Sequence, residues 1–189
     1  MTPKQIFDLL VQQVVDLRSL GAQLGPTGPA GPAHRAAVVL TVAALDTYMH
    51  ERGRTALFAR ASASPDGATK VAGYLKGLDP SDIMGDRAEV LIRYRLSFKT
   101  LQSPTAIDEC MQVAGADPAE VWRLVGIDTG EREQRLRNAL DLAVDRRNQI
   151  AHEGDWDFVQ VAQRHVSESH VDDTLRCITR LVDGLEAHW

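Results

Sequence analysis

Five apolar residues near the C-terminus form the sequence pattern that most restricts how this chain can fold. They are spaced alternately by four and three positions, so all five fall on one face of an α-helix. The five residues are Val171, Leu175, Ile178, Val182 and Leu185. A helix with one continuous apolar face must bury that face against a neighbouring element, and the pattern therefore predicts packed helices.

Most of the remaining chain shows helical periodicity, and no segment alternates apolar and polar residues as a half-buried strand does. We expect helices over residues 4–24, from His34 towards Arg60, over 68–76, over 86–100, from Pro104 through Val113, from Pro118 through Val125, and over 129–153. A chain of 189 residues can bury a core as one domain. The prediction is an all-α bundle with additional short helices, formed by residues 1–189 as a single domain.

Glycine, proline and capping residues mark where the helices begin and end. Residues 25–33 read Gly-Pro-Thr-Gly-Pro-Ala-Gly-Pro-Ala, and three such triplets are far too few for a collagen triple helix. We therefore predict an irregular loop over 25–33, after the first helix. Ser103-Pro104 and Asp117-Pro118 each fit an N-cap followed by proline at the first helical position.

Composition narrows the class of protein. Hydrophobic residues make up 44% of the chain and charged residues 25%, as is typical of globular proteins. The net charge of −5 argues against a protein that coats nucleic acid, although a local site for a few phosphates remains open. Cys110 and Cys177 match no metal or redox spacing and are expected to be buried free thiols. No segment resembles a signal peptide or a membrane span, so we expect a cytoplasmic protein. The sequence has no clustered metal ligands and no Gly-rich phosphate loop, so we expect neither a metal nor a cofactor.

Residues 146–154, Arg-Arg-Asn-Gln-Ile-Ala-His-Glu-Gly, carry the strongest functional signal. Arginine is a permanent cation whose fork of donors suits a phosphate, and histidine can exchange a proton near neutral pH. Arg147 and His152 therefore supply the two groups needed to cleave RNA without a metal ion. The alternative is a purely structural role, in which the histidine caps the end of the helix and the arginine forms a surface ion pair.

Helical geometry restricts how these side chains can meet. Asn148 and His152 are four positions apart, so they lie one turn apart on the same face. Arg147 and His152 are five positions apart, which separates them by about 140° around an ideal helix. They can converge on one phosphate if the helix unwinds near Gly154, or if two copies of the helix meet across a dimer axis.

The segment from Leu136 to Gly154 resembles the signature helix of the HEPN superfamily. That family's motif is an arginine, a polar residue and, after a few variable positions, a histidine; here these are Arg147, Asn148 and His152. Residues 36–51, which contain Ala-Ala-Leu-Asp-Thr-Tyr-Met, resemble the family's other core helix. Residues 98–104, Phe-Lys-Thr-Leu-Gln-Ser-Pro, resemble the RiboL-PSP-HEPN branch. The resemblance spans roughly Ala36 to Trp189.

This resemblance implies a HEPN-like bundle that acts as a metal-independent endoribonuclease, usually as a homodimer whose two motifs line one cleft. Such proteins commonly serve as toxins of toxin–antitoxin pairs or as anti-phage defence effectors, so an antitoxin or defence-system partner is also implied. The expected products are a 2′,3′-cyclic phosphate and a 5′-hydroxyl. The alternative is a non-catalytic module that binds RNA, nucleotides or another protein.

The resemblance also assigns residues to the site. Arg147, Asn148 and His152 are the expected catalytic residues. Arg146 is a secondary candidate for binding RNA phosphates, with a salt bridge to Glu153 or Asp141 as the alternative. Asp46 on the second helix is a secondary candidate for a neighbour of the site, because many relatives carry an acidic residue there; the alternative is a solvated surface carboxylate.

Overall fold

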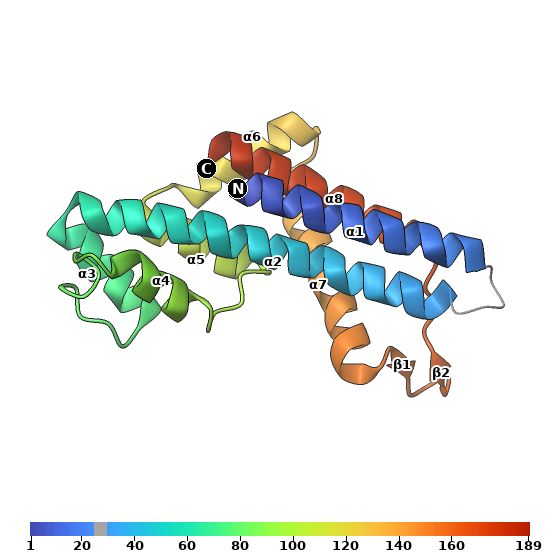
Figure 1. Ribbon diagram of the computed structural model, residues 1–189. Coiled ribbons are helices and arrows are strands. Elements are labelled where there is room, and N and C mark those ends of the chain that lie inside the picture. The colour runs from blue at the N-terminus through green and yellow to red at the C-terminus, as the bar shows by residue number, and fades with distance from the viewer. Residues whose placement is uncertain (25–29) are drawn as a thin grey trace.

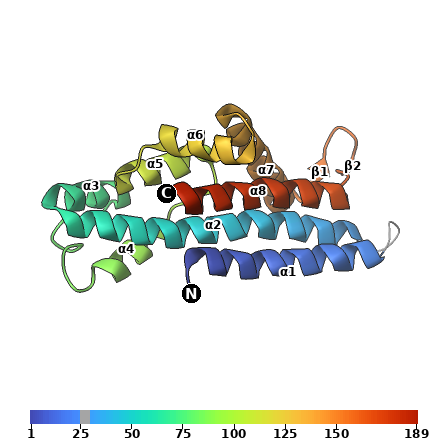
Figure 2. The ribbon, with the colours of Figure 1, turned by 90° about the horizontal axis from the view of Figure 1, so that it is seen from above.

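One long helix organises the molecule. The computed structural model describes residues 1–24 and 30–189, and within them α2 (Ala30–Ala63) contacts six of the other helices. Figures 1 and 2 show α1 (Pro3–Leu24) and α8 (Glu168–His188) lying along α2, while α3 (Pro65–Leu75), α4 (Ala88–Leu96) and α5 (Pro104–Ala114) cover its C-terminal half. The other helices are α6 (Pro118–Thr129) and α7 (Glu133–Glu153). The predicted all-α class is confirmed.

The apolar face of α8 lies in the core, as its spacing predicts. Val171, Ile178, Val182 and Leu185 have no exposed surface. Most of this face joins a continuous core that includes residues of all eight helices, while Val171 belongs to a smaller cluster with Val14, Ala37 and Val38. Half-buried Ile150 of α7 packs against this smaller cluster, so the end of α7 rests on α1, α2 and α8.

Local capping signals predict several helix ends correctly. The side chain of Ser103 accepts the N–H of Ala106 at 3.3 Å, and that of Asp117 accepts the N–H of Ala119 at 3.1 Å. Ser64 caps α3 in the same way by accepting the N–H of Gly67. That third cap corrects the expected start of this helix from residue 68 to Pro65. A serine or aspartate side chain satisfies one of the N–H groups that the first helical turn leaves unpaired.

The predicted loop over residues 25–33 is too long. Residues 25–29 lie outside the described residues, whereas Ala30–Ala33 already belong to α2. The N–H groups in the first turn of a helix have no acceptor within the helix, so Pro32, which lacks an N–H, is tolerated there. Ala30 and His34 are buried, so packing stabilises a first turn that the glycine and proline content does not favour.

Two short strands follow α7 and depart from the prediction that no strand forms. β1 (Trp156–Asp157) pairs antiparallel with β2 (Ala162–Gln163). The turn between them is held by the Asp157 carboxylate, which accepts the N–H groups of Gln160 and Val159. These N–H groups lower the pKa of Asp157. Strands of two residues are too short to show any alternation in the sequence.

The two cysteines differ in burial. Cys110 is fully buried, as predicted, and burial raises the pKa of its thiol to about 12. Cys177 is only partly buried, which corrects the prediction for that residue, and desolvation also raises the pKa of its thiol. Both thiols therefore stay protonated near neutral pH.

None of the helices in the described residues is long and apolar enough to cross a membrane.

Candidate functional site at the end of helix α7

The C-terminal turns of α7 hold the three residues of the Arg-Asn-His motif. The helix continues through Glu153, so Arg147, Asn148 and His152 all have helical backbone. Gly154 ends the helix with a left-handed φ of 62°, which glycine adopts without the steric cost of a Cβ. The chain between Arg147 and His152 is therefore not unwound, and the first of the two routes by which these side chains could converge is absent from this structure.

Arg147 lies on the side of α7 that faces the bundle. It follows Leu140 and Ala143, both buried, along the same helical stripe, and its own side chain is half-buried. Its Nη1 donates to Oδ1 of Asn148 at 3.0 Å. Its Nε is buried and has no hydrogen-bond partner in the described part of the chain. The guanidinium is thus oriented by Asn148 while one of its inner donors remains unused.

His152 lies apart from this pair. Its side chain is exposed at the last turn of α7 and forms no hydrogen bond with another described residue. The structure brings Arg147 and Asn148 together, and it leaves His152 free to contact a ligand or a second molecule. Within one chain these three residues do not form a hydrogen-bonded cluster.

Arg146 has a structural partner that the sequence did not suggest. Both of its terminal nitrogens bond the carboxylate of Asp155, with Nη2 at 2.8 Å from Oδ2. Arg35 of α2 contacts the same carboxylate through Nε, at 2.6 Å from Oδ2. Asp155 has no exposed surface. The salt bridge given as the alternative role of Arg146 is therefore present, but its partner is Asp155 and not Glu153 or Asp141.

This pairing joins α7 to α2 and to the hairpin. Asp155 has a left-handed φ of 61°; its N–H bonds the carbonyl of Gln149, and its own carbonyl accepts the N–H of Arg164 at 2.8 Å. Arg35 Nη2 also donates to the carbonyl of Arg164 at 2.7 Å. We refer to Arg35, Arg146 and Asp155 as the arginine clamp. Its sequence signal was an aspartate directly after the glycine that ends α7, but its partner Arg35 is 120 positions away.

Asp46 is engaged away from the end of α7. Its Oδ1 accepts the N–H of Leu101 at 2.8 Å, in the connection between α4 and α5. His50 lies on the following turn, with Nδ1 at 3.6 Å from Oδ1 of Asp46. Among the described residues, no hydrogen bond or ion pair links Asp46 to Arg147, Asn148 or His152. Asp46 therefore has a structural role: its carboxylate binds the backbone N–H of Leu101 and links α2 to the connection between α4 and α5.

Comparison of the chain with family models, with curated proteins and with solved structures found no match. Within residues 1–24 and 30–189, no three histidine, cysteine, aspartate or glutamate residues gather as ligands of a metal ion would.

Proposed function

We propose that this protein is an endoribonuclease of the HEPN type, which needs no metal ion for cleavage and acts as a homodimer in a toxin or anti-phage defence system. The observation that supports this proposal is the arrangement of the Arg-Asn-His motif at the end of α7. Asn148 orients the Arg147 guanidinium, whose Nε has no partner among the described residues, and His152 is exposed in the last turn of the same helix. A cation and an accessible imidazole are the groups that RNA cleavage by internal transfer requires.

The proposed reaction uses the 2′-hydroxyl of the RNA as the nucleophile. His152 takes the proton of this hydroxyl or gives a proton to the departing 5′-oxygen. Arg147 neutralises the charge that grows on the non-bridging phosphate oxygens. The phosphorus forms a bond to the 2′-oxygen as its bond to the 5′-oxygen breaks. The products are a 2′,3′-cyclic phosphate and a 5′-hydroxyl end.

Cleavage of single-stranded RNA is expected to fall by about a hundredfold or more in His152→Ala and in Arg147→Ala, since each change removes one catalytic contribution. Gel analysis of a labelled RNA, with identification of the end groups, measures this effect. Arg132→Ala is the matched control, because Arg132 is exposed at the other end of α7 and is expected to leave cleavage unchanged. An oligonucleotide with one deoxynucleotide at the cleavage position should resist there, because it lacks the nucleophile.

Two outcomes would contradict this proposal. Cleavage that persists unchanged in both variants places the active site elsewhere. Failure of the wild type to cleave a varied set of RNAs, together with retained RNA binding, favours the alternative of a non-catalytic binding module. One observation favours that alternative: Arg147 is half-buried and forms no hydrogen bond with His152 within one chain.

The separation of Arg147 and His152 on α7 leads to the proposal of a site shared between two chains. If each site combines Arg147 of one chain with His152 of the other, a heterodimer of the two inactive variants contains one intact site. Mixing Arg147→Ala with His152→Ala after dissociation should then restore up to about a quarter of wild-type cleavage, because half of the random dimers are heterodimers with one good site. Light scattering should show a dimer. A monomer, or no recovery on mixing, would overturn the shared site.

A further inference from the structure

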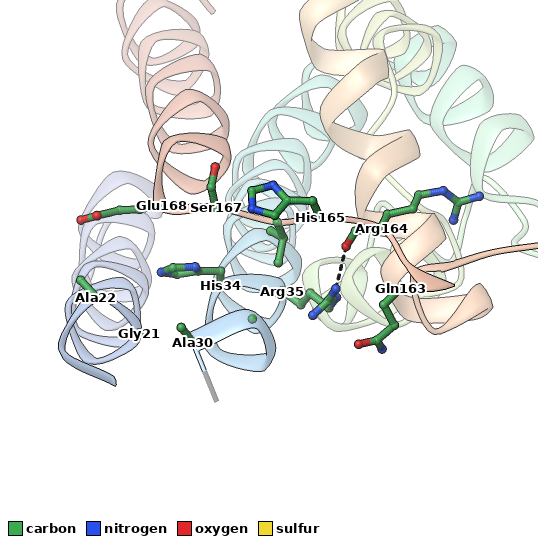
Figure 3. Close-up of a pocket in the computed structure, with 12 residues that line it drawn as sticks. Gly21, Ala22, Ala30, His34, Arg35, Gln163, Arg164, His165, Ser167 and Glu168 are labelled. Atoms are coloured by element: carbon green, nitrogen blue, oxygen red, sulfur yellow. Dashed lines mark hydrogen bonds between the residues drawn. The ribbon is translucent and has the colours of Figure 1, made fainter. Parts of the chain in front are cut away.

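A cavity of about 510 Å³ lies at the end of the bundle where α1 ends, α2 begins and the chain passes from β2 to α8. Its volume is within the range of about 300–1,000 Å³ that small-molecule sites occupy. Figure 3 shows His34, Arg35, His165, Ser167 and Glu168 around it. Arg147, Asn148 and His152 do not line it. We propose that this cavity binds the phosphate group of a small molecule, independently of the function proposed for the end of α7.

His34 is a buried polar side chain in the wall of this cavity. It is only 6% exposed, yet its Nε2 has no hydrogen-bond partner among the described residues. The ring extends from α2 towards α1 in the wall of the cavity (Figure 3). It fits there because residue 21 is glycine: a Cβ at that position would lie 2.7 Å from Nε2. Nε2 lies against Gly21 and is closed off from solvent, so the ring forms a polar part of the cavity wall and the donors that can reach a ligand come from its neighbours.

The charged groups around the cavity favour an anion. Nε and Nη2 of Arg35 are used by Asp155 and by the carbonyl of Arg164, whereas its Nη1 lies beside Gly31 in the cavity wall and bonds no other described residue. His165 is exposed and its ring nitrogens form no hydrogen bond with another described residue. The one carboxylate of the lining, Glu168, already pairs with Arg18 at 2.9 Å. Arginine and imidazole donors are thus available, while the acidic group is neutralised.

Two helices also begin at this cavity. Ala30 and Gly31 belong to the first turn of α2, and Ser167 and Glu168 begin α8. The N-terminus of a helix carries a partial positive charge and unpaired N–H groups, both of which favour a phosphate. At the start of α8 the N–H of Ser167 already donates to Nδ1 of His170, and the N–H of His170 bonds the carbonyl of Ser167. Among the described residues, the donors left for a ligand are therefore Nη1 of Arg35, the ring of His165 and the first turn of α2.

The test uses inorganic phosphate and ribose 5-phosphate as probes, each titrated into the wild-type protein by calorimetry and by NMR of the histidine side chains. We expect saturable binding that shifts the resonances of His34 and His165. Tighter binding of ribose 5-phosphate identifies a sugar phosphate as the ligand, and equal affinity identifies free phosphate; both results support the site. Absence of saturable binding for both probes at millimolar concentration would overturn it.

Matched variants show whether binding occurs in this cavity. Ala22 is exposed on α1 and lines the cavity, so Ala22→Trp should fill its mouth and lower the affinity by at least about tenfold. Gln23→Trp places the same side chain on the adjacent exposed position, outside the lining, and should bind as the wild type does. His165→Ala should weaken binding by about tenfold through loss of a charged hydrogen bond. Equal affinity in Ala22→Trp and Gln23→Trp would place any phosphate binding elsewhere.

Discussion

Replacing Asp155 by asparagine is expected to lower the free energy of unfolding by about 3 kcal/mol, the lower end of the cost of removing one partner from a buried ion pair. Asp155 is fully buried between Arg35 and Arg146, so the substitution leaves two guanidinium groups without their anion. The lower end applies because the arginine side chains keep 14% and 20% of their surface exposed. Asparagine also tolerates the left-handed backbone at this position, so the loss reports the charge and not the backbone.

Urea unfolding measures this effect as a lower midpoint at unchanged slope. Asp145→Asn is the matched control, because Asp145 is an exposed aspartate of α7 whose side chain, among the described residues, bonds only Gln149 on the next turn. Its effect should stay within about 0.5 kcal/mol. A similar small effect at Asp155 would show that water replaces the carboxylate, and the arginine clamp would then not be what holds the end of α7.

Replacing Trp122 by alanine is expected to lower the free energy of unfolding by about 3–5 kcal/mol, as for other large buried aromatic residues. Trp122 has no exposed surface, and its Nε1 donates to Oδ1 of Asp108 at 2.7 Å. Arg137 of α7 lies over its ring at 4.5 Å and bonds the other oxygen of Asp108 at 2.6 Å. The alanine variant therefore leaves a cavity and also loosens the contact that holds the first half of α7 to α5 and α6.

Two variants separate these contributions. Trp122→Phe keeps most of the apolar volume and loses the N–H donor, so we expect a cost of about 1 kcal/mol, since Arg137 still satisfies Asp108. Trp156→Ala is the control for removing a tryptophan from the surface, because Trp156 is 37% exposed in β1, and it should cost well under half as much as Trp122→Ala. Thermal or urea unfolding gives each value. Equal losses at Trp122 and Trp156 would contradict the role of Trp122 as an anchor.

Features that depend on a few neighbouring residues could be predicted from the sequence. The apolar face of α8 follows from the spacing of Val171, Ile178 and Leu185, because three and four positions correspond to one helical turn. The caps at Ser103 and Asp117 involve N–H groups two or three positions away. The end of α7 at Gly154 depends on the conformational freedom of one residue. The three residues of the motif lie within two turns of one helix, so their positions along α7 could also be predicted from the sequence.

Features that join distant segments were decided by the tertiary structure. The first turn of α2 is helical despite Gly31 and Pro32, because Ala30 and His34 are buried there. Asp46 serves the backbone of Leu101, and Asp155 pairs with Arg35 across 120 positions. Whether a charged residue is free for a ligand or occupied by another side chain depends on what packing brings beside it. Helical periodicity depends on residues within one or two turns, whereas burial and charge pairing join residues across the whole bundle. Burial and charge pairing therefore decide which arginine side chains remain available to bind a ligand.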